Sequence, residues 1–195
     1  QRDKNLWIFN AGNSFAGNPK WMFEYIIRHH KEIKPVWMCY NADTMNYVHK
    51  LGYEAELYHS SKGKSVMAKA GVYVVEMCKE VFQPELSGIT VLNLWHGVGC
   101  KSIERKVTDG FLQERIAKKY IQNNDILRNN QLFLVTSEIM EKHFKEQCGI
   151  DDDKVIRAGY PRCVVNDNIQ SYDHDIRKKK GLPANTKLAI YCPTY

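Results

Sequence analysis

The sequence predicts an α/β fold: a Rossmann-like, doubly wound parallel sheet. Short apolar runs alternate with helix-like segments along most of the 195 residues, an alternation typical of parallel βαβ units. The run Ile89–Trp95 is apolar on both faces, as expected of a central parallel strand. A hydrophobic content of 44% is sufficient for a sizeable core. The chain is therefore expected to form one domain or a little more, and charge-rich disorder is excluded.

The elements of the N-terminal half follow from turn and capping residues. Leu6–Phe9 is a short apolar strand, followed by a glycine- and asparagine-rich turn over Asn10–Asn18. Pro19 then opens a helix through His30, because the missing N–H of proline has no partner at a first helical position. The next expected elements are a strand over Val36–Tyr40, a helix from the N-cap Asp43 to Leu51, a helix over Ser60–Ala70 and a strand over Val72–Met77.

The same alternation continues after the central strand Ile89–Trp95. Hydrophobic residues at helical spacing follow Ser137, which can cap that helix. The expected elements are a basic amphipathic helix over Asp109–Asn123, a strand over Leu132–Thr136, the helix after Ser137, and a strand over Lys154–Ala158 that leads into Gly159–Arg162.

The C-terminal part differs in composition. Residues 171–181 are polar and basic, which predicts a linker or connecting helix, and Lys187–Tyr195 begins another strand with no helix to cover it. We therefore predict one domain over residues 1–170, followed by a linker and the first strand of a second domain over 171–195.

Composition and motifs exclude several classes of protein. The longest uncharged segment, Leu86–Cys100, is shorter than the roughly 20 residues of a membrane-spanning helix. The N-terminal residues Gln1–Asn5 do not resemble a signal peptide. The net charge of +6 suits an anionic substrate or the negative face of a membrane. No nucleic-acid recognition motif, G-x-G-x-x-G or Walker loop is present.

Neither the cysteines nor the histidines suggest a metal site. The six cysteines contain no C-x-x-C pair, which predicts reduced thiols in a cytosolic protein. The adjacent His29 and His30 would point about 100° apart on a helix and share no face. We predict neither a metal nor a cofactor.

His96 is the candidate with the clearest chemical role. It follows the central strand, between Trp95 and Gly97. Ligands of open α/β sheets bind at the carboxyl ends of the strands, and a histidine there can act as a general base near neutral pH. A core histidine held by backbone hydrogen bonds remains the alternative.

Several polar residues at predicted strand ends could bind an anionic substrate. A lysine can meet a phosphate as a point charge, an arginine through its planar fork, and a helix start through backbone N–H groups. The alternatives are a solvated lysine, an arginine paired with an acidic neighbour, and ordinary turn and cap residues. The candidates are Lys101, Arg162, Asn13, Ser14 and Lys20.

Four segments in this order together resemble the CDP-glycerol glycerophosphotransferase family, which comprises teichoic acid primases and polymerases and their capsule-building relatives. They are Gly17–Ile26, Leu94–Gly97 with Lys101, Gly159–Arg162 and Ile190–Tyr195. The family commonly continues its Trp-His-Gly with Thr-Pro before the lysine, whereas this chain has Val98-Gly99-Cys100. That departure bears on the identity of the acceptor more than on the type of reaction.

The resemblance implies a two-domain GT-B-type transferase, of which residues 1–170 are the acceptor-side half. In such an enzyme an acceptor hydroxyl attacks the β-phosphorus of a CDP-polyol, with glycerol or ribitol as the polyol, and CMP leaves. The resemblance makes His96 the base and Lys101, Gly97, Arg162, Asn13, Ser14 and Lys20 substrate-binding residues. Its donor half would lie downstream, so the 195-residue chain alone is expected to be inactive.

The implied acceptor is a lipid-linked glycan or a polyol-phosphate polymer at the inner face of the bacterial cell membrane. The protein would then be cytoplasmic and peripheral to that membrane. The basic segment Phe111–Tyr120 could lie on the membrane, although packing of its apolar stripe on the sheet is the expected arrangement. Two other functions stay open: a GT-B sugar transferase that uses a nucleotide sugar, and a non-catalytic module that binds phosphorylated glycans.

Overall fold

The computed structural model of the chain describes residues 1–77, 83–99, 101–122, 131–163 and 176–191. It divides into two compact units, Gln1–Val164 and Val165–Tyr195, and each is described by itself. The predicted domain boundary between residues 170 and 171 lies outside the described residues and stays a prediction.

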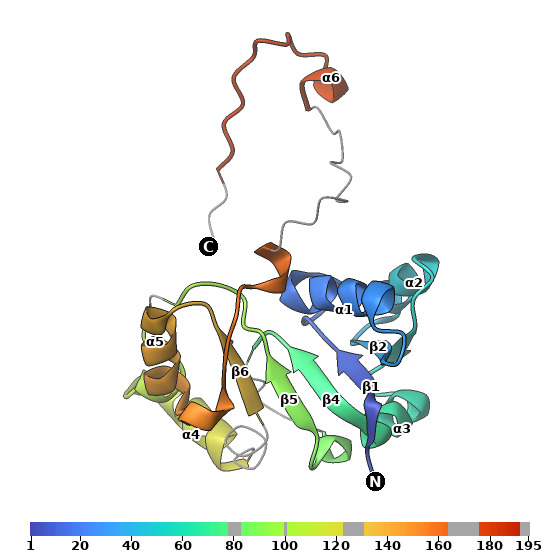
Figure 1. The fold of residues 1–195 in the computed structure, drawn as a ribbon. Coiled ribbons are helices and arrows are strands. Elements are labelled where there is room, and N and C mark those ends of the chain that lie inside the picture. Colours follow the sequence, from blue (N-terminus) through green and yellow to red (C-terminus); the bar gives the residue numbers. More distant parts are fainter. Residues whose placement is uncertain (78–82, 100, 123–130, 164–175, 192–195) are drawn as a thin grey trace. The chain divides into compact units, whose positions relative to one another are not determined.

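The first unit is built on a seven-stranded sheet in which every pair of neighbouring strands is parallel, in the order β3-β2-β1-β4-β5-β6-β7 (Figure 1). The strands are β1 (Asp3–Phe9), β2 (Lys34–Cys39), β3 (Ala55–Leu57), β4 (Ala70–Val75), β5 (Thr90–Asn93), β6 (Gln131–Val135) and β7 (Val155–Arg157). This arrangement confirms the predicted doubly wound parallel sheet. The strand order reverses between β1 and β4, which is where ligands bind in folds of this kind.

Helices flank the sheet along its length (Figure 1). In the first unit these are α1 (Gly17–His29), α2 (Ala42–Lys50), α3 (Ser61–Lys69), α4 (Gly110–Gln122) and α5 (Glu138–Cys148). Short 3-10 turns lie in the connections between elements, namely η1 (Pro84–Leu86), η2 (Glu104–Lys106), η4 (Asp152–Lys154) and η5 (Pro161–Cys163).

Capping residues explain where these helices begin. Ser60 and Ser137 cap α3 and α5 through their hydroxyls, as expected of a serine before a helical run. The predicted cap Asp43 is wrong: the side chain of Asn41 accepts the Thr44 N–H at 2.8 Å, and Asp43 lies in the first turn. A carboxylate in that turn favours the helix through the dipole instead.

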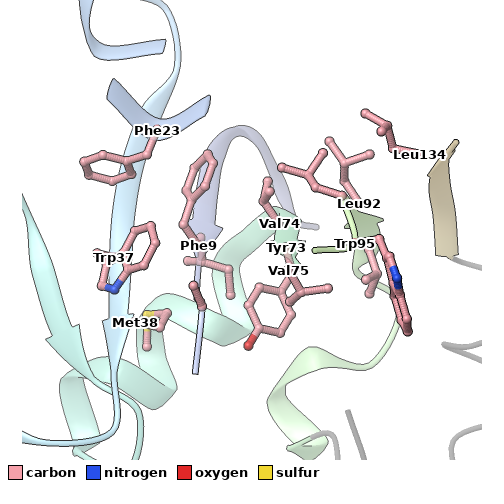
Figure 2. Packing of buried hydrophobic residues seen from close by; sticks show 14 of the residues in the cluster. Phe9, Phe23, Trp37, Met38, Tyr73, Val74, Val75, Leu92, Trp95 and Leu134 are labelled. Atoms are coloured by element: carbon pink, nitrogen blue, oxygen red, sulfur yellow. The ribbon is translucent and has the colours of Figure 1, made fainter. Parts of the chain in front are cut away.

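The core of the first unit is rich in aromatic side chains. Phe23 of α1 lies against the rings of Phe9 and Trp37 (Figure 2), with ring centroids 5.3 and 5.7 Å apart in edge-to-face geometry. After β5, Trp95 packs against Phe133 of β6 and Phe144 of α5, with ring centroids 5.6 and 5.0 Å apart. These fully or largely buried rings fix α1 and the end of β5 relative to the sheet.

Helix α4 contributes little to the core. Tyr120 packs against it and the buried Lys119 forms an ion pair with Glu104 of η2. However, Phe111, Leu112 and Ile121 are 77%, 55% and 78% exposed. The expectation that the whole apolar stripe packs on the sheet is therefore wrong. No helix within the described parts of the chain is long and apolar enough to span a bilayer.

The second unit contains α6 (Ile176–Lys180), consistent with the predicted linker or connecting helix. The strand predicted from Lys187 is wrong for residues 187–191, which form neither helix nor strand. Ile190 and Tyr191 are 78% and 89% exposed there. A β-strand requires a neighbouring strand to which it is hydrogen-bonded. The described residues of this unit, 176–191, form no such pair of strands. Residues 192–195 of that prediction lie outside the described residues.

Candidate functional site

A cluster of polar residues lies at the carboxyl ends of four strands in the first unit. Asn18 begins α1 after β1, Glu76 follows β4, His96 follows β5, and Arg162 lies in η5 after β7. Helix α1 contacts η5, and Figure 1 shows η5, in orange, beside the start of α1. Because β1 and β4 flank the reversal of strand order, the cluster lies where ligands of this fold bind.

The backbone before His96 has an unusual conformation. Trp95 has a φ of 52°, in the left-handed region that a bulky residue rarely adopts. The Trp95 N–H donates to Asn93 Oδ1 at 3.0 Å, and the Trp95 carbonyl accepts from Asn18 Nδ2 at 2.7 Å. Both polar groups of the strained residue are therefore held by buried side chains.

His96 itself faces solvent at the end of this segment. Its ring stacks on the Trp95 indole, with centroids 4.5 Å apart and planes 23° apart. Burial of part of the ring lowers the pKa of His96 below its ordinary value, and the charge of Arg162 lowers the pKa further. Near neutral pH the imidazole is thus neutral and able to accept a proton.

Arg162 and Gly97 form the neighbouring part of the cluster. The Tyr160 hydroxyl donates to the Gly97 carbonyl at 2.6 Å, which attaches the loop after β5 to the segment after β7. The Arg162 guanidinium lies 5.6 Å from the Tyr160 ring centroid, and a Cβ at position 97 would approach it to 3.7 Å. The cationic fork therefore lies beside the Trp-His-Gly segment.

Glu76 occupies the N-terminus of α1. Its Oε2 accepts the Asn18 N–H at 3.2 Å, and a Cβ at Gly17, whose φ is 68°, would lie 2.0 Å from the same oxygen. Burial raises the pKa of Glu76, whereas the Asn18 N–H and the charge of Arg162 lower it. A carboxylate is the group a helix N-terminus favours, so this end of α1 already holds an anionic group.

Asn13, Ser14 and Lys20 make contacts with residues other than those of this cluster. The Asn13 carbonyl accepts the Thr44 hydroxyl of α2 at 2.8 Å, and the Ser14 hydroxyl donates to the Ala11 carbonyl at 3.4 Å. Lys20 lies 4.0 Å from Glu24 and over the ring of Phe15. Their predicted role in substrate binding stays a prediction.

Lys101 is exposed, and the backbone N–H groups of Gly99 and Ile103 on either side of it donate to side chains of α5. The Gly99 N–H donates to the Met140 sulfur at 3.3 Å, and a Cβ at Gly99 would lie 2.4 Å from His143 Nε2. Only glycine fits there without displacing the His143 ring. No hydrogen bond or ion pair within the described parts of the chain joins Lys101 to His96 or Arg162.

The structure adds Asn18, Glu76 and Tyr160 to the residues predicted from sequence. Asn18 and Tyr160 belong to segments that the sequence singled out, but only the fold shows that both contact the His96 loop. Glu76 lay within the predicted strand Val72–Met77 and carried no other signal. Among the residues that the structure describes, no group of three or more side chains could hold a metal ion.

Comparisons with known proteins identify the family of the chain. A model of the family described as CDP-Glycerol:Poly(glycerophosphate) glycerophosphotransferase matches residues 1–195. The teichoic acid poly(glycerol phosphate) polymerase of Bacillus subtilis (strain 168) is 25% identical over 198 residues, which cover 94% of this chain and 25% of that protein. The polymerase of the same description from Staphylococcus epidermidis RP62A is 22% identical and is matched over 26% of its length.

Solved structures of the wall teichoic acid polymerase TagF share the fold. A histidine-to-alanine variant matches 95% of this chain and 47% of its own, with a TM-score of 0.74 and 18% identity. A histidine-to-asparagine variant soaked with CDPG matches 100% of this chain and 48% of its own, with a TM-score of 0.75 and 21% identity. The chain thus spans about a quarter of the curated relatives and about half of the solved chains.

Proposed function

Because the chain belongs to the CDP-glycerol:poly(glycerophosphate) glycerophosphotransferase family, we propose that the protein containing it transfers glycerol phosphate from CDP-glycerol to a growing teichoic acid. Residues 1–170 form the acceptor-side domain in this proposal, and residues 171–195 lead into a donor-binding domain. The acceptor is a lipid-linked glycan or the polyol-phosphate polymer itself. The observation that carries the proposal is the cluster of His96 and Arg162 at the carboxyl ends of the strands, where the Arg162 guanidinium lies beside Gly97 and its charge lowers the pKa of His96.

His96 acts as the general base in this mechanism. The acceptor hydroxyl oxygen attacks the β-phosphorus of CDP-glycerol, and the hydroxyl proton passes to the imidazole. The new oxygen–phosphorus bond forms as the bond between the β-phosphorus and the bridging oxygen breaks, and CMP carries that oxygen away. Arg162 stabilises the negative charge on the transferring phosphoryl group, since such reactions depend on positioning and charge neutralisation.

Donor specificity tests this function. We expect the full-length protein that contains these residues to release CMP from CDP-glycerol when a glycerol-phosphate oligomer is present. CDP-ribitol and UDP-sugars are the competing donors, and the 195-residue chain alone is expected to release no CMP. CMP can be followed by chromatography of the nucleotides.

Each alternative function gives a different result in that assay. Turnover of a UDP-sugar with both CDP-polyols untouched would replace the proposal by a sugar transferase. Binding of the phosphorylated acceptor without turnover of any donor would indicate a binding module. Preference for CDP-ribitol would keep the reaction and change the polyol.

We further propose that α4 holds the protein at the inner face of the cell membrane. The exposed side chains of Phe111, Leu112 and Ile121 share this helix with Arg115 and Lys118, a combination that suits an anionic lipid surface. The chain is expected to sediment with phosphatidylglycerol vesicles at low salt and to remain in solution with phosphatidylcholine vesicles.

The Phe111→Ser variant sharpens this membrane test. Burial of one such side chain is worth about 1.5–3 kcal/mol, so the substitution should weaken partitioning by roughly tenfold or more. Gln113→Ser, on the same helix, is the matched control and should bind like the unmodified chain. Absence of binding to anionic vesicles at low salt would remove the membrane role of α4.

A further inference from the structure

Asn18 is a buried amide with no place among the reacting groups. Its side chain is 0% exposed, although it lies at the second residue of α1, where asparagine is not needed to form a helix. A buried amide is costly unless its donors and acceptor are bonded. The hydrogen-bond partners of Asn18 therefore indicate why an amide is buried at this position.

Both ends of the Asn18 amide contact segments that carry functional side chains. Nδ2 donates to the Trp95 carbonyl at 2.7 Å, and Oδ1 accepts the Arg162 N–H at 3.3 Å. The first segment follows β5 and the second follows β7, so the two are distant in sequence. One amide group thus joins the segment that carries His96 to the segment that carries Arg162.

The contact with Trp95 falls at a strained residue. A φ of 52° for tryptophan persists only when its surroundings hold it, and strain of this kind costs on the order of 1–3 kcal/mol. The indole packs against Phe133 and Phe144, which also contact each other, and the His96 ring stacks on it. The orientation of the Trp95 peptide group therefore decides where the His96 ring leaves the backbone.

Catalytic histidines are commonly oriented by a carboxylate or carbonyl bonded to the second ring nitrogen. Within the described parts of the chain, no carboxylate is hydrogen-bonded to His96. The ring is instead located by the stack on Trp95 and by the backbone that Asn18 holds. The orientation of His96 therefore depends on Asn18 of α1.

We propose that Asn18 is a positioning residue for the transfer reaction: its amide holds the strained Trp95 backbone and the Arg162 backbone together, and so sets His96 beside the Arg162 guanidinium. The inference rests on the proposed function for its kinetic consequence, because His96 must be the base. Its structural consequence, the fixed stack of His96 on Trp95, does not depend on that function.

The structural consequence is tested by NMR of the 195-residue chain with 13C-labelled histidine. The Trp95 indole should shift the His96 ring protons upfield through its ring current, and the His96→Ala spectrum assigns them. In Asn18→Ala these resonances should move toward the positions of exposed histidines. Asn41→Ala removes a capping asparagine of α2 outside the cluster and should leave them unchanged.

The kinetic consequence is tested by CMP release from the full-length protein. Asn18→Ala should lower kcat by about 10–100-fold with little change in KM, because misplacement of a catalytic group by about 1 Å costs about that much. In a His96→Ala background the same substitution should cost far less, because most of its effect passes through His96. A purely structural role would reduce both backgrounds equally.

Asn18→Asp keeps the inference testable if the alanine variant melts at a lower temperature. It preserves the size of the side chain and the oxygen that faces the Arg162 N–H, but replaces the donor to the Trp95 carbonyl by an oxygen. The expected loss of the His96 shift is the same. Unchanged His96 resonances and unchanged kcat in folded Asn18 variants would overturn the inference and leave the reaction in place. Full activity of His96→Ala would instead overturn the base assignment.

Discussion

Replacement of His96 by alanine in the full-length protein is expected to reduce CMP release from CDP-glycerol by about 10²–10⁴-fold, the usual contribution of a placed general base. The loss should fall on kcat, because the imidazole meets the hydroxyl proton as it is transferred. The melting temperature should stay unchanged, since the His96 ring is exposed and leaves no cavity when truncated. Initial rates with saturating donor and acceptor give the comparison.

The pH dependence provides a second measure of His96. Burial and the nearby Arg162 charge lower its pKa, so the proton-accepting form persists to a lower pH than for an ordinary histidine. Activity should therefore be lost only as the pH falls below the ordinary range of histidine, and should be steady above it. His29→Ala, at the other end of α1, is the matched control and should retain the full rate. An unchanged rate for folded His96→Ala would exclude His96 as the base.

Six of the seven strands of the sheet could be predicted from the sequence. The runs around β1, β2, β4, β5, β6 and β7 are apolar and bounded by turn residues, and all six were expected. Strand β3 was missed because its three residues, Ala55–Leu57, contain no apolar run, whereas the equally short β7 contains the β-branched pair Val155 and Ile156. The Asn41 cap was missed because two neighbouring polar residues could serve, and only the backbone decides between them.

The candidate site was predictable residue by residue but not as a group. His96 and Arg162 follow predicted strands, so each could be placed at a carboxyl end. Their proximity depends on the order of β4, β5, β6 and β7 across the sheet. No local sequence pattern specifies that order. Asn18 reads as an ordinary turn residue until the fold brings the Trp95 carbonyl and the Arg162 N–H to its two ends.

Glu76 shows how the fold can change the meaning of a local pattern. The start of α1 predicted an anion site, because the first N–H groups of a helix lack partners. The structure places the Glu76 carboxylate at one of those groups, the Asn18 N–H. A phosphate at this end of the sheet would meet that negative charge, and Arg162 is a cation of the cluster that can offset it.

Arg162→Ala is accordingly expected to lower kcat/KM for CDP-glycerol by about 10²–10³-fold, the cost of removing one group that stabilises the charge of a transition state. Arg162→Lys should recover only part of the rate, because a lysine keeps the charge but loses the planar fork. The Arg162→Ala substitution also tests whether the Arg162 charge acts on His96. Since the Arg162 charge lowers the pKa of His96, its removal should raise that pKa and move the acidic loss of activity to higher pH.

Arg157 of β7 offers a matched control for Arg162→Ala. It is paired with Glu141 of α5 at 2.7 Å, away from the His96 cluster, so Arg157→Ala removes an arginine from the same part of the chain without touching the site. We expect its kcat/KM and its pH profile to match those of the unmodified protein. Equal losses in the two variants would mean that Arg162 acts through stability alone. A lower rate in Arg162→Ala without any shift of the acidic limb would place the guanidinium on the substrate but not in the electrostatic environment of His96.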